Sequence, residues 1–327
     1  MESVAIDGVG VAASCCAHLL SAAGLGISWM RPMRPRVPAI VVSQATQALM
    51  ADVFEQPDLF RGAHRLERRI VAWGPEAEPV ALPHAAVVVS EEALVARTEP
   101  RVLPEAGGAA EWTVFATYPF PGTRSEFCFG RRHACAVGVE MKDPGAGCCW
   151  VESLESGWLF LIPGWLIAVG GAPDGLLAAS RLVAAQIRGV TGEQAEFPAY
   201  PRIADPLCGP GWLACGSAAM AFDPICGDGS GNAVREAILA SAVIRAAARG
   251  EPAEPLLAHY QRRLLAGFLR HLELSLEFYR SGHGGAWWER ETQALEQGVA
   301  WCSEELARMP AFRYRLEGFE LLPVSDR

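Results

Sequence analysis

Residues 3–14 read SVAIDGVGVAAS, an apolar run that is followed by two glycines and then by small residues. The run 3–7 is typical of a buried strand, and residues 12–23 are apolar on nearly every face, as in a buried helix. Between them the chain has the form G-x-G-x-x-A, in which glycines permit a tight turn and close approach of a pyrophosphate. A helix N-terminus attracts anions, so this turn predicts a dinucleotide site, although a glycine turn without a ligand is the alternative. The residues expected to hold the cofactor there are Gly8, Gly10, Ala12, Ala13 and Ser14.

The second apolar run, 25–30, predicts the next strand, which stops at the proline- and arginine-rich segment 31–36. Dinucleotide-binding folds carry an Asp or Glu at the end of this strand, where it holds a ribose hydroxyl. Arg31 stands near that position, so the acid is absent. Arg31 and Arg34 are able to hold a phosphate instead, and solvated loop arginines are the alternative interpretation.

The rest of the chain predicts an interrupted parallel sheet. Apolar runs at 111–117, 133–141, 147–153 and 158–170 favour an antiparallel sheet. Other predicted elements are helices at 43–61, 91–98, 174–191, 232–249 and most of 254–309, and strands at 69–74, 85–90 and 211–215. This order indicates a parallel sheet into which an antiparallel domain is inserted.

Composition restricts the function classes. The 327 residues carry a net charge of −9 and a pI near 5.4, so nucleic acid is an unfavourable partner. No run of 18 apolar residues is present, and the acidic start MESVAID does not resemble a signal peptide. We therefore expect a cytoplasmic protein without a membrane span. The ten cysteines form no C-x-x-C pair, which predicts reduced, buried thiols and no metal site.

Residues 211–229 read GWLACGSAAMAFDPICGDG, a strand followed by a glycine-rich turn. This segment resembles the GDAA…DP…G.G flavin motif of FAD-dependent monooxygenases and tryptophan-halogenase-like flavoproteins, which share the p-hydroxybenzoate hydroxylase-like fold. In that family the loop lies along the flavin's ribityl chain and pyrophosphate. The positions that carry the match are Asp223, Pro224, Gly227 and Gly229, while Ser217 replaces the aspartate of the motif.

Two further segments extend the resemblance. Trp158–Pro163 is similar to the halogenase signature WxWxIP, with Phe160 in place of the second tryptophan, and 271–288 resembles the family's C-terminal helical segment. The implied fold is α/β, with a Rossmann-like FAD-binding domain, an inserted antiparallel-sheet substrate domain and a C-terminal helical region. We expect the FAD domain at 1–36, 88–125 and 205–253, the substrate domain at 37–87 and 126–204, and the helical region at 254–327.

The resemblance implies an FAD-dependent monooxygenase that hydroxylates an aromatic or indole-like substrate, either a small molecule or a protein-bound group. Electrons would come from NAD(P)H or from a separate flavin reductase. The side chains expected to line its substrate pocket are Trp73, Trp158, Phe160 and Pro163. His64 and His84 are the candidate acid/base groups. Core packing for the aromatic residues and structural hydrogen bonds for the histidines are the alternatives.

Departures from the family favour other functions. Halogenation is disfavoured because Lys142 lies in a Lys-Asp-Pro-Gly turn, whereas the family carries its lysine within the segment that corresponds to 37–45. Arg31, Ser217 and a shortened stretch at about 98–112 favour an accessory or binding protein that keeps the fold without FAD. A phosphate-bearing ligand held by the Gly8 turn and Arg31 is a third interpretation.

Overall fold

The computed structural model describes residues 3–34, 36–100 and 109–324, so the shortened stretch lies partly outside the described residues. Its first sheet has the strand order β14-β15-β6-β1-β2. The strands are β1 (Ser3–Asp7), β2 (Gly26–Met30), β6 (Trp112–Phe115), β14 (Cys208–Gly209) and β15 (Trp212–Ala214). All of them except β14 run parallel. The antiparallel partner expected for 111–117 is therefore wrong, because β6 lies between β1 and β15 as a parallel strand.

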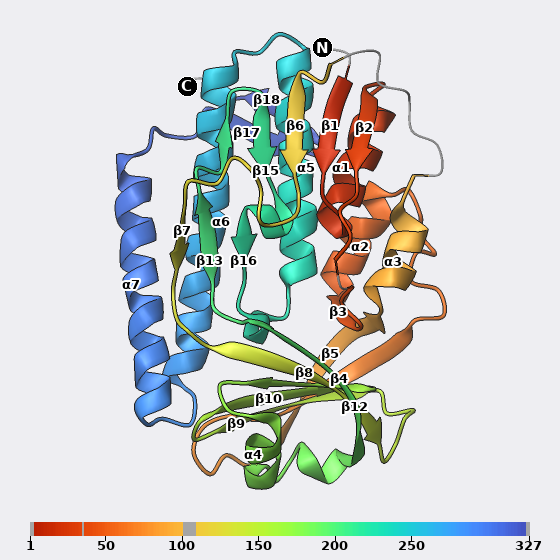
Figure 1. The fold of residues 1–327 in the computed structure, drawn as a ribbon, viewed down its shortest axis with the longest axis vertical. Coiled ribbons are helices and arrows are strands. Elements are labelled where there is room, and N and C mark those ends of the chain that lie inside the picture. Colours follow the sequence, from red (N-terminus) through yellow and green to blue (C-terminus); the bar gives the residue numbers. More distant parts are fainter. Residues whose placement is uncertain (1–2, 35, 101–108, 325–327) are drawn as a thin grey trace.

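Two helices pack against each other on one face of this sheet, α1 (Val11–Ala22) and α5 (Gly229–Ala248) (Figure 1). The buried side chains of α1 are small, which permits close packing against both β1 and α5. Figure 1 shows the carboxyl ends of the parallel strands pointing toward a second sheet at the other end of the molecule. In an open α/β sheet this is the edge at which ligands bind.

The second sheet has the order β12-β8-β11-β10-β9-β4-β5-β3 and is antiparallel except between β4 and β9. Its strands are β3 (Ile40–Ser43), β4 (His64–Ala72), β5 (Val80–Val89), β8 (His133–Met141), β9 (Cys148–Leu154), β10 (Gly157–Ile162), β11 (Trp165–Val169) and β12 (Ile187–Pro198). The short helix α4 (Pro173–Ala179) packs on its outer face (Figure 1). The apolar run predicted at 158–170 is two strands, because the chain reverses at Gly164 with φ +83°.

The helix predicted over 174–191 is wrong beyond Ala179. The Glu152 carboxylate accepts hydrogen bonds from the backbone N–H groups of Arg181 and Val183 at 2.9 Å each. These amides therefore have partners without a helix, and β12 follows at Ile187 with β-branched residues and glycines.

Helices complete the molecule. They are α2 (Gln44–Val53), α3 (Glu91–Thr98), α6 (Ala253–Arg280) and α7 (Ala286–Arg308). The helix predicted at 91–98 is confirmed, whereas the one predicted at 43–61 ends at Val53, before Pro57. A small sheet of β7 (Ser125–Cys128), β13 (Arg202–Asp205) and β16 (Met220–Ala221) and a hairpin of β17 (Tyr314–Glu317) and β18 (Glu320–Pro323) make up the remaining strands.

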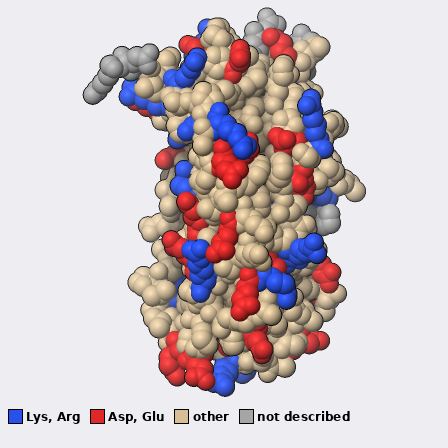
Figure 2. Space-filling model, turned by 90° about the vertical axis from the view of Figure 1, so that its left-hand side faces the viewer, with Lys and Arg blue, Asp and Glu red and all other residues tan. Residues whose placement is uncertain are grey.

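The surface carries both signs of charge. Figure 2 shows acidic and basic side chains interspersed on the face that carries α7. Ion pairs such as Arg280–Glu296, at 2.7 Å, account for part of this mixture. This face therefore lacks the single-sign field that would steer a polyanion to it. Within the described residues, we find no helix whose length and hydropathy would suit a bilayer.

Candidate functional site

The turn between β1 and α1 contains two glycines in conformations that L side chains rarely adopt. Gly8 has φ +144° and Gly10 has φ +93°. A Cβ atom on Gly8 would lie 2.8 Å from the Cβ of Ala116. Helix α1 begins without a side-chain cap and without an acidic residue in its first turn. Its first backbone N–H groups therefore have no capping side chain, and such a helix start suits an anion.

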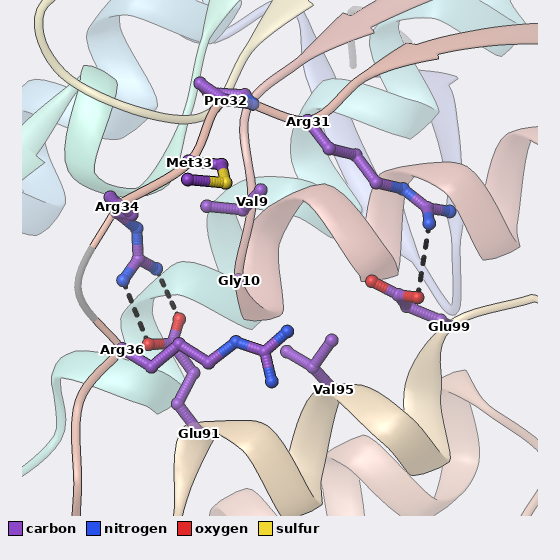
Figure 3. A pocket seen from close by; sticks show the side chains of 10 residues that line it. All are labelled: Val9, Gly10, Arg31, Pro32, Met33, Arg34, Arg36, Glu91, Val95 and Glu99. Atoms are coloured by element: carbon purple, nitrogen blue, oxygen red, sulfur yellow. Dashed lines mark hydrogen bonds and ion pairs between the residues drawn. The ribbon is translucent and has the colours of Figure 1, made fainter.

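A cavity of about 570 Å³ lies at this helix N-terminus, between the loop after β2 and α3 (Figure 3). The residues that line it are Val9, Gly10, Arg31, Pro32, Met33, Arg34, Arg36, Glu91, Val95 and Glu99. Each arginine of the loop pairs with a glutamate from α3 or its end. The pairs are Arg31–Glu99 at 3.4 Å, Arg36–Glu92 at 3.4 Å and Arg34–Glu91 through two hydrogen bonds. The volume suits a nucleotide-sized ligand, and a bound phosphate would replace a glutamate as the partner of one of these arginines.

Arg31 occupies the end of β2, where dinucleotide-binding folds place an acid. Its guanidinium lies 4.1 Å from the centre of the Trp29 ring. The Trp29 Nε1 donates a hydrogen bond to the carbonyl of Gly8 at 2.9 Å. Arg31 is therefore stacked on the residue that braces the glycine turn, and it points its charge toward the cavity rim (Figure 3).

The Arg34–Glu91 pair lies directly over Gly10. A Cβ atom on Gly10 would be 2.9 Å from Arg34 Nη2 and 3.0 Å from Glu91 Oε1. Glu91 is buried and also accepts a hydrogen bond from the backbone N–H of Val37 at 2.8 Å. This ion pair must shift for a phosphate group to contact the backbone at Gly10.

The small residues after the turn are buried in the helix packing. Ala12, Ala13 and Ser14 are at most 4% exposed. A Cβ atom on Gly216 would lie 2.7 Å from the Cβ of Ala12, so α1 approaches the segment after β15 very closely. Small side chains at these positions permit that approach.

In the second glycine-rich segment, the side chains of Ser217 and Asp223 form hydrogen bonds with other protein groups. Ser217 is exposed, and its hydroxyl donates to the carbonyl of Ala116 at 3.3 Å. The Asp223 carboxylate is fully buried and accepts hydrogen bonds from Arg132 Nε at 2.8 Å and from the N–H of Ile225 at 2.9 Å. Pro224 follows, and Gly227 adopts a left-handed conformation with φ +64°. Asp223 thus holds the shape of this loop.

The loop leads into α5, which begins at Gly229 without a side-chain cap hydrogen bond and without an acidic residue in its first turn. The carboxylate of Asp228, the preceding residue, accepts hydrogen bonds from Thr46 Oγ1 at 2.9 Å and from Arg235 Nη1 at 2.8 Å. Helices α1 and α5 therefore both begin without a capping side chain, and each follows a glycine-containing turn.

A buried charge network anchors the Asp223 loop to the rest of the molecule. Arg132 Nη1 donates to Glu291 Oε2 on α7 at 2.6 Å, and its guanidinium lies 4.6 Å from the ring centre of Tyr279 on α6. Burial alone lowers the pKa of Arg132, but Asp223, Tyr279 and Glu291 together raise it above its ordinary value. The Tyr279 hydroxyl accepts a hydrogen bond from Trp158 Nε1 at 3.2 Å. The network thereby connects the loop, the second sheet and the two long helices.

A small cavity of about 20 Å³ lies between the second sheet and the Asp223 loop. Its lining residues are Val41, Arg69, Val151, Trp158, Phe160, Pro224, Ile225 and Gly227. The structure therefore brings Trp158 and Phe160, both predicted as pocket residues, next to Pro224 and Gly227 of the flavin-type motif. A volume near that of one water molecule means that this cavity is closed to an aromatic ring.

The other predicted pocket residues lie elsewhere. Trp73 Nε1 donates to the carbonyl of Phe278 at 3.0 Å, and its ring packs edge-on against Trp288. Pro163 is in the turn between β10 and β11. His64 Nε2 is 3.0 Å from the carbonyl oxygen of Ala146 and is also outside the small cavity.

His84 lies beside that cavity. Its Nε2 is 3.2 Å from Arg69 Nη2. Burial, reinforced by the charge of Arg69, lowers the pKa of His84 to about 4. The imidazole is therefore neutral near pH 7 and accepts the hydrogen bond from Arg69, which makes it a poor acid at that pH.

Comparison with known proteins gives matches in structure alone. No family model and no curated protein matches the sequence. The peptidyl tryptophan dihydroxylase QhpG, essential for tryptophylquinone cofactor biogenesis, superposes with a TM-score of 0.74 at 20% identity, over 98% of this chain and 86% of QhpG. The flavin-dependent halogenase CmlS gives 0.76 at 16%, over 94% and 71%. The p-nitrophenol 4-monooxygenase PnpA from Pseudomonas putida DLL-E4 gives 0.67 at 14%, over 94% and 98%.

The chain has the fold of flavin-dependent monooxygenases and halogenases. The fold class predicted from the two glycine-rich segments is confirmed. Within this flavoprotein fold, sequence reasoning missed Arg69, Arg132 and Glu236. The Glu236 Oε2 accepts the N–H of Gly216 at 2.7 Å beneath the second glycine segment, and burial raises its pKa to about 8. A glutamate among the apolar residues of 233–244 was the available signal, since an isolated acid on a buried helix needs a specific partner.

Proposed function

We propose that the protein is an FAD-dependent monooxygenase that hydroxylates an aromatic or indole-like substrate. The observation that carries this proposal is the Gly8–Gly10 turn, which faces a cavity of about 570 Å³ at the N-terminus of α1 in a flavoprotein fold. Support comes from the neighbours, which include a peptidyl tryptophan dihydroxylase and a p-nitrophenol monooxygenase.

The two ends of the site fit FAD unequally. At the nucleotide end, the turn at Gly8 and Gly10 and the N-terminus of α1 would hold the pyrophosphate, and Arg31 would lie near the ribose or a phosphate. At the ring end, Gly227 and the N-terminus of α5 would face the flavin. The cavity there is about 20 Å³, so entry of a ring requires the Asp223 loop and the second sheet to separate.

Bound FAD would supply oxygen activation, in which O2 and two electrons from NAD(P)H or a flavin reductase yield a hydroxylated ring and water. The chain would place the substrate and exclude water. Trp158 and Phe160 present buried aromatic surface beside Pro224, which suits a flat, electron-rich ring. We do not propose halogenation, because Lys142 Nζ donates to the carbonyl of Ala185 at 2.7 Å in an exposed turn outside the small cavity.

The second candidate is an accessory or binding protein that keeps this fold without a flavin. The closed cavity of about 20 Å³ favours it, as do Arg31 and Ser217 at two positions where the family carries acids. A carboxylate at each position would add charge-assisted hydrogen bonds of about 1.5–3 kcal/mol to a cofactor.

Purification followed by visible absorbance and FAD titration calorimetry separates the two candidates. The monooxygenase proposal requires bound or tightly binding FAD, and substrate-dependent O2 consumption in the presence of NADPH or a flavin reductase. Absence of measurable FAD affinity in the wild type would contradict the monooxygenase proposal. Tight binding of FAD by the wild type would instead eliminate the flavin-free candidate.

A further inference from the structure

The carboxylate of Glu91 lies beside Gly10, the residue directly before helix α1, and lines the large cavity (Figure 3). A Cβ atom on Gly10 would be 3.0 Å from Glu91 Oε1. A helix start without a capping side chain attracts anions. The protein therefore places a negative charge of its own where a phosphate group of a nucleotide is expected.

Three interactions hold Glu91 in this position. Arg34 Nη1 donates to Glu91 Oε2 at 2.9 Å, and Arg34 Nη2 donates to Oε1. The backbone N–H of Val37 donates to Oε2 at 2.8 Å. Glu91 is also in the first turn of α3, where the helix dipole favours a negative charge. The protein alone therefore satisfies this carboxylate, and a ligand has to compete with it.

Burial distinguishes the Arg34–Glu91 pair from the neighbouring pair Arg36–Glu92. The side chain of Glu91 is 6% exposed, whereas that of Glu92 is 77% exposed. An exposed ion pair contributes little to stability, but a buried carboxylate that loses its cation is left with a costly charge. A phosphate group can therefore take Arg36 from Glu92 at little cost, whereas separating Arg34 from Glu91 consumes part of the binding free energy.

We propose that Glu91 is an intramolecular competitor for the phosphate groups of a nucleotide diphosphate, which binds only when this carboxylate moves away from Gly10 and Arg34. Two negative groups in contact repel each other, so the carboxylate and a phosphate do not share the position. The protein thereby requires a ligand with enough negative charge to replace the carboxylate. This inference rests on the proposed function for the use of the cavity by a nucleotide cofactor, but ADP alone is sufficient to test it.

The experiment is titration calorimetry of the whole protein with inorganic pyrophosphate, ADP, adenosine and FAD. Glu91→Gln removes the negative charge, and its amide oxygen can still accept the N–H of Val37. Glu92→Gln is the matched control, because it makes the same change of net charge at the adjacent residue, which does not line the cavity. Urea unfolding of both variants checks that the fold is retained.

We expect Glu91→Gln to bind pyrophosphate and ADP about tenfold more tightly than the wild type, because the binding-competent arrangement no longer requires the ion pair to separate. Glu92→Gln should stay within about twofold of the wild type, and adenosine should not distinguish the three proteins. The inference is overturned if Glu91→Gln binds ADP no more tightly than the wild type. Equal gains in both variants, or an equal gain for adenosine, would also overturn it.

Hydrogen exchange of the wild type gives a second test that requires no variant. If ADP displaces the Glu91 carboxylate, the N–H of Val37 loses its acceptor, so a peptide that contains Val37 should exchange faster at saturating ADP. Unchanged or slower exchange of this peptide would overturn the inference.

Failure of the inference is distinguishable from failure of the proposed function. Tighter ADP binding by Glu91→Gln, with no FAD binding by either protein, would reject the monooxygenase and keep the competition at Gly10. Equal and measurable FAD and ADP affinities in the wild type and Glu91→Gln would keep the cofactor and reject the competition.

Discussion

Arg132 and Asp223 form a fully buried ion pair in which the Nε and Nη2 atoms of the arginine both donate to one carboxylate oxygen, at 2.8 and 2.5 Å. Arg132 directly precedes β8 of the second sheet, and Asp223 begins the loop that leads to α5. The aspartate of the flavin-type motif therefore holds the loop before α5 against the start of β8 in the second sheet. Its carboxylate is already occupied by protein donors.

This pair predicts a large loss of stability in Arg132→Met. The variant leaves the carboxylates of Asp223 and Glu291 buried without their cation, and breaking a buried pair in this way typically costs about 3–5 kcal/mol. Urea unfolding measures the effect. Arg188→Met is the control, since its pair with Glu140 is exposed and should change the free energy of unfolding by less than about 1 kcal/mol. Equal stability of the two variants would contradict the structural role of Arg132.

The close contacts at Gly8 predict that alanine destabilises the protein there but not at Gly175. In Gly8→Ala the new Cβ would lie 2.8 Å from the Cβ of Ala116 and 2.9 Å from the backbone N of Thr117, and φ is +144°. Backbone cannot move aside cheaply, so we expect a loss of about 1–3 kcal/mol and weaker nucleotide binding. Gly175→Ala in α4 has no atom within 4 Å and should be neutral or stabilise by up to about 1 kcal/mol. Thermal unfolding of both variants is the measurement.

The position of Arg31 at the large cavity predicts that it contacts the nucleotide end of a flavin and not the ring end. If it holds a phosphate or ribose at the large cavity, Arg31→Met should weaken ADP and FAD binding by about tenfold and leave riboflavin binding unchanged. Titration calorimetry with the three ligands tests this, and Arg61→Met, on an exposed loop before β4, serves as the control. An unchanged affinity for ADP would leave Arg31 as a surface residue that stacks on Trp29 and pairs with Glu99.

Local signals in the sequence were sufficient for the first βαβ unit and for α3. Each of these elements has its own apolar period and its own glycine or polar boundary within a few residues. The parallel placement of β6 was not predictable in this way, because its partners β1 and β15 are distant in the sequence.

The side chains of the site depended on longer-range effects. A bulge in β4 between Leu66 and Arg68 reverses the alternation, so Arg69 faces the cavity where simple alternation from Leu66 would have placed Arg68. The Arg132–Asp223 pair joins residues 91 positions apart, and no local pattern identifies that partner. Gly8, Gly10 and Gly227 were predictable because their positive φ values favour glycine, whereas Gly229 lies in α5 and is not required by its conformation.

The raised pKa of the buried Glu236 carboxyl predicts that the free energy of unfolding falls as pH rises. Burial raises its pKa from 4.5 to about 8, so between these values the folded protein holds a proton that the unfolded chain has released. The folded state then binds more protons than the unfolded state, so the free energy of unfolding decreases across this window by at most about 1.4 kcal/mol per pH unit.

Glu236→Gln cannot ionise, and its amide oxygen can still accept the N–H of Gly216. Urea unfolding at several values between about pH 5 and pH 9 should therefore give a shallower slope for Glu236→Gln and a higher stability than the wild type near pH 8. Glu155→Gln, in the exposed turn before β10, should follow the wild-type curve. Parallel curves for Glu236→Gln and the wild type would show that Glu236 is ionised beneath the glycine segment throughout this range.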